Sequence, residues 1–165
     1  MKLTLFIAFL LTTLTTLNAY AEYDVLDKNN CGPVVNKDPN LKIMQTEQKN
    51  VLQTTLQLAS KAPLTGYFRT GYCATDENDH GVHVIAAKVT DNFLKFSKAN
   101  GNDLITPRLS SGFAGLKAGN TWCLCAMRWK EALDAGVAPP VVLEATNVKA
   151  LEYVPLTTLQ KNAAQ

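Results

Sequence analysis

Two cysteines separated by a single residue, Cys123 and Cys125, place the strongest constraint on what this chain can fold into. If their segment is extended, both sulfurs lie on the same face of the strand, because side chains alternate with a period of two. A disulfide between residues so close together is hard to close, so each cysteine should have a distant partner. The remaining cysteines are Cys31 and Cys73. We predict two disulfides, each joining Cys31 or Cys73 to Cys123 or Cys125.

Other states of the cysteines remain open at the level of sequence. One disulfide with two free thiols is the nearest alternative. A zinc site is another, in which Cys73, His83, Cys123 and Cys125 would form a tetrahedral Cys₃His set. A reactive thiol is a third, because Cys125 should lie near a helix N-terminus, where the helix dipole favours the thiolate. The chain has no C-x-x-C motif, and we predict no cofactor.

The first 21 residues have the pattern of a cleaved signal peptide. Lys2 precedes the uncharged run Leu3–Leu17, and Ala19-Tyr20-Ala21 is a small-x-small cleavage site. The apolar run, at about 15 residues, is shorter than the ~20 that span a bilayer. We therefore expect residues 1–21 to be removed, so that the mature chain starts at Glu22 and is exported to the periplasm or the medium. Disulfides form in such compartments.

Charge and motifs exclude several functional classes. The net charge is only +2, which gives no basic surface for nucleic acid, and no later segment is apolar for long enough to cross a membrane. The motifs G-x-S-x-G, G-x-G-x-x-G and H-E-x-x-H are absent, so standard hydrolase, dinucleotide-binding and metalloprotease chemistries have no support. We expect a small molecule or a protein as the partner, and the oligomeric state stays open.

Short strands and helices alternate without a β-α-β rhythm, which predicts a small single α+β domain with long loops. Residues 22–49 form an irregular N-terminal arm ahead of a domain at 50–165, with a helix somewhere between 41 and 60. Apolar and β-branched runs predict strands at 65–72, 82–89, 122–126, 141–143 and around 153–154. Capping residues and periodicity predict helices at 91–100 after Thr90, after 126 as far as 135, at 147–151 after Thr146, and at 156–163 after Pro155. Residues 102–120 should form a long loop.

The candidate binding surface lies where the loop 102–108 meets the segment 122–129. Its candidate residues are polar or aromatic: Arg69, Asn102, Asp103, Thr106, Arg108, Trp122, Arg128 and Glu144. A pocket with Arg69, Asp103, Arg128 and an indole ring would suit a small polar ligand. Simpler roles compete with it, since Asp103 can cap a turn, Arg128 can pair with Glu144, and Trp129 fits a core position.

The two histidines have simpler expectations. His80 lies in the polar stretch 74–81 and should be solvated. His83 begins an apolar run, so we expect a hydrogen-bonded structural histidine.

From Asn50 onward the chain resembles a family of small, mostly bacterial proteins known only as a domain of unknown function. The resemblance rests on four motifs in order: PLTGYFRTGYC at 63–73, GNDLITP at 101–107, WCLCAMRW at 122–129 and VVLEAT at 141–146. The family pattern has cysteine where this chain has Ala59 and Ala86, proline at Ala114 and histidine at Asn147. Because that family has no established activity, the resemblance implies domain boundaries and motifs but no reaction.

The first functional hypothesis is therefore an exported, disulfide-stabilised domain that binds a small molecule or a protein. The main alternative is an enzyme that uses a thiolate or a metal at Cys123 and Cys125. A structural or accessory envelope protein without a pocket is the third.

Overall fold

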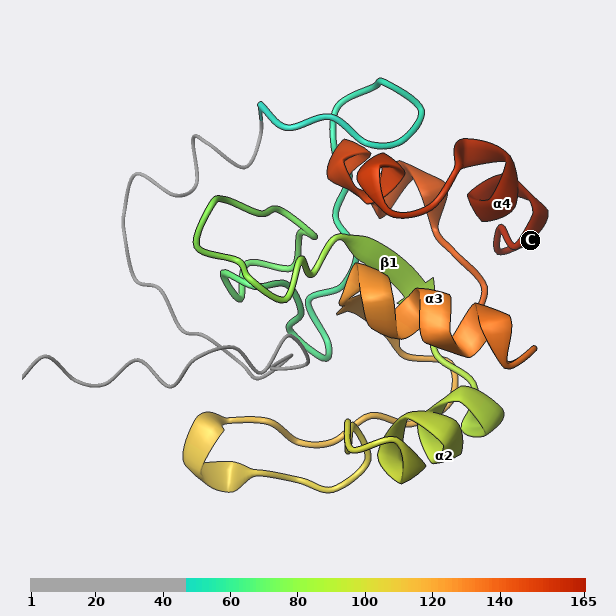
Figure 1. Cartoon of the computed structure of the whole chain (residues 1–165). Helices are drawn as coiled ribbons and strands as arrows, with labels where there is room; N and C mark the ends of the chain where they lie inside the picture. Colours follow the sequence, from blue (N-terminus) through green and yellow to red (C-terminus); the bar gives the residue numbers. More distant parts are fainter. Residues whose placement is uncertain (1–46) are drawn as a thin grey trace, which may run out of the picture.

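The computed structural model describes residues 47–165, and strand β1 (Ile85–Lys88) lies at their centre (Figure 1). β1 pairs antiparallel with β2 (Thr121–Leu124), and Ile85 lies opposite Leu124. The other edge of β1 forms a single bridge from Ala87 to Val141. β1 therefore has backbone partners on both edges, although the regular sheet has only two strands.

Three α-helices surround this sheet, and two of them begin directly after Thr90 and Pro155, as predicted. Helix α2 (Asp91–Ala99) starts after Thr90, whose hydroxyl accepts a hydrogen bond from the amide of Phe93. Helix α3 (Ala126–Asp134) follows β2 directly. Helix α4 (Leu156–Lys161) starts after Pro155. Short 3₁₀ helices occupy η1 (Leu109–Ser111), η2 (Leu143–Ala145) and η3 (Val148–Glu152).

The core forms where α3 packs against the sheet. Ala126, Trp129 and Ala132 are completely buried on α3, and their spacing of three puts them on one face of the helix. The small alanines on either side let the helix approach closely around the large indole. The indole nitrogen of Trp129 donates a 3.0 Å hydrogen bond to the carbonyl of Pro139, which satisfies its polar atom in the core. Trp129 is thus a core residue, as predicted.

The predicted strand at 65–72 is wrong, because this segment folds as a series of turns and bends. Gly66, Arg69 and Gly71 all have positive φ, at +90°, +54° and +92°. These angles lie in the left-handed region and reverse the chain direction. A side chain at Gly66 would also collide with the carbonyl oxygen of Tyr72. The aromatic residues of this segment suggest a strand, but the positive φ angles at its glycines fold the backbone into turns.

The end of the chain also differs from the predicted elements. Val141 forms only isolated bridges rather than a strand over 141–143. The cap of η3 is Asn147, whose side chain accepts from the amide of Lys149, and not Thr146. The hydroxyl of Thr146 instead donates to the carbonyl of Val142, which removes it from a capping role. Residues 153–154 are a turn and a bend rather than an extended pair.

Other elements agree with the sequence, and the small α+β class is confirmed. The strand predicted over 82–89 is regular only at 85–88. The loop 102–120 carries only η1 and extends away from the sheet and helices (Figure 1). Residues 47–60 contain no helix, and the signal peptide, Cys31 and most of the arm lie outside the described residues. Among residues 47–165, no helix is long and apolar enough to cross a membrane.

Candidate functional site

Two arginines and two aromatic rings form a cluster at one end of β2. The guanidinium carbon of Arg69 lies 4.8 Å from the centroid of the Trp122 ring. Trp122 meets Phe113 edge to face at 5.6 Å, and the guanidinium of Arg108 lies 5.4 Å from the Phe113 ring. We call these four residues the arginine–aromatic cluster. It joins three parts of the chain: the glycine-rich turn, the long loop and β2.

The positive charges of this cluster have no carboxylate partner among the described residues. Neither Arg69 nor Arg108 forms a salt bridge there. Partial burial lowers the pKa of Arg69, and repulsion from the nearby Arg108 lowers it further. Arg69 also sits at a positive φ of +54°, a backbone position that few non-glycine residues adopt. A charged, strained and unpaired side chain in this setting is typical of a binding site.

The loop 102–108 is held in shape by Asp103. One carboxylate oxygen accepts from the amides of Ile105 and Thr106, each at 2.9 Å, and the other accepts from the Thr106 hydroxyl at 2.7 Å. These bonds from Thr106, with the Lys98 ammonium at 3.0 Å, hold the pKa of Asp103 well below its ordinary value. Asp103 therefore caps a turn, the simpler of its two predicted roles, and Thr106 is its main hydrogen-bond partner.

The same turn positions Arg108. Its Nη2 donates to the carbonyl of Asp103 at 3.3 Å, which leaves the other guanidinium N–H groups available. The carbonyl of Asn102 accepts a 2.8 Å bond from the Ser97 hydroxyl at the end of α2. The loop is thereby anchored to α2 at one end and presents Arg108 at the other.

Two predicted site residues lie elsewhere. Arg128 pairs with Glu131 at 2.9 Å and donates to the carbonyl of Asn100, so the predicted ion pair with Glu144 is wrong. Glu131 follows Arg128 by three residues on the same helix, which makes it the closer partner. The carbonyl of Glu144 accepts from the side chain of Asn50. Neither Arg128 nor Glu144 belongs to the arginine–aromatic cluster by any of these contacts.

The cysteines act as cross-links. Cys73 and Cys123 form a disulfide, with their Cα atoms 5.3 Å apart, and Cys125 is also disulfide-bonded. No cysteine in the described part of the chain is a free thiol. The Cys₃His zinc set and the thiolate enzyme both need free thiols, and in this state of the chain the disulfides occupy Cys73, Cys123 and Cys125. Within the same residues, no three His, Cys, Asp or Glu side chains gather around a common point.

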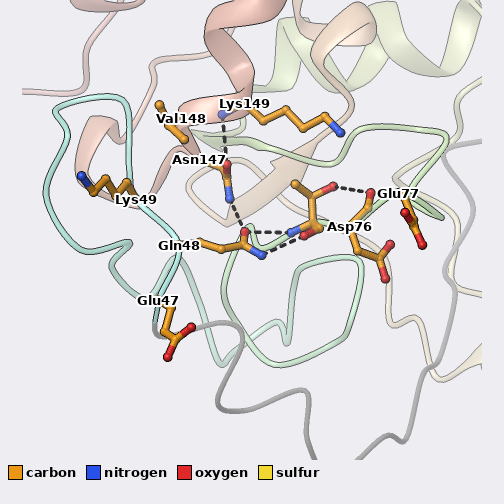
Figure 2. Close-up of a pocket in the computed structure, with 9 residues that line it drawn as sticks. Glu47, Gln48, Lys49, Asp76, Glu77, Asn147, Val148 and Lys149 are labelled. Carbon is orange, nitrogen blue, oxygen red and sulfur yellow. Dashed lines mark hydrogen bonds between the residues drawn. The ribbon is translucent and has the colours of Figure 1, made fainter.

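A hollow of about 450 Å³ opens between the segments 47–49, 75–77 and 147–149 (Figure 2). At its floor, Oε1 of Gln48 accepts from the Asn147 side chain at 2.6 Å and from the amide of Thr75 at 3.2 Å. Nε2 of Gln48 donates to the carbonyl of Thr75 at 2.8 Å. The amides are thus largely engaged with one another. Charged residues of both signs surround them without salt bridges among the described residues: Glu47, Lys49, Asp76, Glu77 and Lys149.

A buried carboxylate, that of Asp79, is hydrogen-bonded to Thr75 in the lining of this hollow. The hydroxyl of Thr75 donates to Oδ2 of Asp79 at 2.9 Å, and the backbone amide of His83 donates to the same oxygen at 2.8 Å. Oδ1 of Asp79 lies 2.6 Å from Nδ1 of His83. Burial of Asp79 raises its pKa, but the bonds from His83 and Thr75 outweigh this and the net pKa is lowered. The prediction of a hydrogen-bonded His83 is confirmed, and His80 is exposed as predicted.

Comparison with protein families assigns the described domain. Residues 49–163 match the profile of a family described as uncharacterised proteins conserved in bacteria (DUF2237). The chain belongs to this family. No curated protein matches the chain significantly. The match extends over nearly all of the described residues, and it confirms the resemblance drawn from the motifs.

Three positions at which the sequence departs from the motif pattern of the resemblance lie in two of the features described above. Ala86 packs in the cluster of buried residues around the Cys73–Cys123 disulfide, and Ala59 lies against it. Both stand where the pattern has cysteine, so the substituted positions converge in space. Asn147, which stands where the pattern has histidine, lies in the floor of the hollow in Figure 2.

The sequence does not reveal the hollow or the role of Asp79. None of the predicted binding residues lines the hollow. Gln48 belongs to the predicted arm, and its contacts with Thr75 and Asn147 span 27 and 99 residues. Asp79 is one of several acidic residues in a polar loop, and only its closeness to His83 in the sequence could have singled it out.

Proposed function

We propose that this protein is an exported, disulfide-linked domain that binds a small oxyanion, a carboxylate or a phosphate, at Arg69 and Arg108. One observation carries the proposal. Arg69 stacks on Trp122 beside a second arginine, with no carboxylate among residues 47–165 to neutralise either charge. Two like charges held close together repel, and an anion placed against both would turn that repulsion into attraction.

The chemistry of arginine suits this ligand. Its planar guanidinium can donate two parallel hydrogen bonds to a carboxylate or a phosphate. The side chain of Arg69 donates no hydrogen bond to a described residue, and its nitrogens are not among the buried atoms that lack a partner. They therefore reach solvent. Phe113 and Trp122 are only 6% and 7% exposed, so they support the arginines from below rather than forming the contact surface.

Two features support export as part of this proposal. The first is the signal-peptide pattern of residues 1–21. The second is the cross-linked state of Cys73, Cys123 and Cys125, which is typical of oxidising compartments. Export does not identify the ligand, but an exported domain would bind a solute that is present outside the cytoplasm.

The experiment is a calorimetric titration of the intact mature protein with inorganic phosphate and, separately, benzoate. The variants are Arg69→Gln and Arg108→Gln, and the matched control is Lys130→Gln, which removes a positive charge from α3 outside the cluster. We expect about tenfold weaker binding in each arginine variant, since a hydrogen bond to a charged group contributes about 1.5 kcal/mol. The control should bind as the wild type does.

Equal binding by Arg69→Gln and the wild type would contradict the proposal. If neither anion binds the wild type, the remaining hypothesis is a structural or accessory envelope protein. Comparison of phosphate with benzoate distinguishes a phosphate ligand from an aromatic carboxylate.

A further inference from the structure

His83 has one ring nitrogen fixed by the protein and the other available. Nδ1 lies 2.6 Å from Asp79 Oδ1, and the side chain of Asp79 is fully buried. An ionised carboxylate only accepts hydrogen bonds, so Nδ1 is the donor to Asp79, and in the neutral form of the ring Nε2 holds the lone pair. Nε2 makes no hydrogen bond to a described residue. It is also not one of the two buried unpartnered side-chain atoms in residues 47–165, Thr70 Oγ1 and Arg128 Nε.

The surroundings hold the imidazole rigidly. The ring of Tyr67 stacks on it, with centroids 6.1 Å apart and planes 21° apart. Gly81 leaves room for the ring, because a Cβ at that position would come within 2.5 Å of His83 Cε1. Val82 has a φ of +49°, which is a rare backbone conformation for a β-branched residue. Strained backbone of this kind is found at sites where a side chain must be held in one position.

The position of Asp79 is fixed in turn by a hydrogen-bond chain. The Thr75 hydroxyl donates to Asp79 Oδ2, and the backbone of Thr75 is clamped by the side chain of Gln48. Gln48 continues the chain to Asn147 at the floor of the hollow in Figure 2. Both oxygens of the Asp79 carboxylate therefore have a hydrogen-bond partner. His83 lies two residues before the start of strand β1.

We propose that His83 is a nucleophile, acting through Nε2 on small neutral or cationic acyl esters. A carboxylate that accepts the Nδ1 proton orients an imidazole and stabilises the positive charge that develops on it. The adjacent loop favours uncharged or cationic substrates, because Asp76 and Glu77 form no salt bridge with described residues. The pair is separate from the arginine–aromatic cluster and does not depend on anion binding there.

The reaction proceeds in two steps. Nε2 attacks the carbonyl carbon of the ester, and the bond to the leaving oxygen breaks with its electron pair on that oxygen. The acyl-imidazolium formed retains its Nδ1 proton against Asp79. Water then adds to the acyl carbon and loses one proton to the alcohol anion or to solvent. The C–N bond breaks, returning its electron pair to Nε2 and releasing the carboxylic acid.

The test uses p-nitrophenyl acetate as a neutral ester, with p-nitrophenyl phosphate as the anionic comparison. His83→Asn should lower the second-order rate constant for the acetate about tenfold or more. The matched control is His80→Asn, which removes the exposed histidine of the same loop and should leave the rate unchanged. The wild type should turn over the phosphate no faster than buffer does.

Asp79 is a positioning residue, and its test is the pH profile. Asp79→Asn should lower the rate several-fold and change its dependence on pH, because a neutral amide at this position can no longer stabilise the charge of the imidazolium. The profile is measured above about pH 5, where the contribution of Asp79 to stability no longer changes with pH, so a change in stability alone would lower the rate without altering the shape of the profile.

Acylation of the wild type gives a readout that does not depend on any variant folding. After brief treatment with diethylpyrocarbonate, peptide mass mapping should find the modification on His83 at least as early as on the exposed His80. Modification of His80 alone, or a wild-type rate in folded His83→Asn, would overturn the proposal.

Discussion

The sulfur of Cys73 is bonded to the sulfur of Cys123, so the turn that carries Arg69 is joined covalently to the strand that carries Trp122. Trp122 directly precedes Cys123, and Arg69 lies shortly before Cys73. The amide of Cys123 also donates a 2.9 Å hydrogen bond to the hydroxyl of Thr65 in the same turn. The cross-link and the stack of Arg69 on Trp122 therefore form a single structural unit.

Removal of this disulfide should destabilise the domain. Cys73 and Cys123 are 50 residues apart. Closing a loop of that length lowers the entropy of the unfolded chain, which raises the free energy of unfolding by about 4 kcal/mol at 25 °C. The double variant Cys73→Ala/Cys123→Ala should lose about that free energy of unfolding in urea. A loss below about 1 kcal/mol would contradict this role for the cross-link.

The remaining cysteine, Cys31, should be bonded to Cys125. Cys31 lies outside the described residues. In the predicted scheme of two disulfides, a Cys73–Cys123 bond leaves Cys31 and Cys125 to form the second one. Peptide mapping without reductant should recover both pairs from protein collected outside the cytoplasm, in a chain that starts at Glu22. A product retaining residues 1–21, or a titratable thiol, would contradict export with full oxidation.

The sequence predicts local features of this fold well where a single residue determines them. Thr90 before α2, Pro155 before α4 and the buried Trp129 follow from capping preferences and periodicity. Features that depend on the sign of φ are not predictable in this way. The strand expected at 65–72 is broken by the positive φ of Gly66, Arg69 and Gly71, and aromatic content does not report the sign of φ.

The candidate site shows the same division. Asp103 as a turn cap follows from its local sequence, whereas the stacking of Arg69 on Trp122 depends on a turn and a disulfide that join separate segments. Arg128 pairs with Glu131, one turn away on its own helix, rather than with the distant partner expected for it. The hollow in Figure 2 needs three segments from across the domain, and no local pattern marks it.

Acid should destabilise the fold partly through Asp79. Its pKa is lower in the folded protein than its ordinary value, so its contribution is fully present above about pH 4 and is lost as the pH falls below that value. Asp79→Asn should lower the free energy of unfolding by about 2 kcal/mol near pH 5. Urea titrations near pH 2.5 should show a smaller difference from the wild type. An equal difference at both pH values would contradict the assignment.

Trp129→Phe should cost about 2–3 kcal/mol of unfolding free energy, because it removes volume from the core and leaves the Pro139 carbonyl without its donor. Trp122→Phe is the matched comparison, because the Trp122 indole donates no hydrogen bond to a described residue. The smaller phenyl ring still provides a face on which Arg69 can stack. Its cost should be clearly smaller in the same denaturation experiment. Equal costs would contradict the role of the Trp129 hydrogen bond in the core.

Anion binding at Arg69 and Arg108 can be tested by nuclear magnetic resonance within a single sample. The two indole N–H signals report on different places: Trp122 lies under Arg69, and Trp129 is completely buried and bonded to Pro139. On titration with inorganic phosphate at constant ionic strength, the Trp122 signal should shift and saturate while the Trp129 signal stays in place. No saturable shift at Trp122, or equal shifts at both indoles, would contradict the claim.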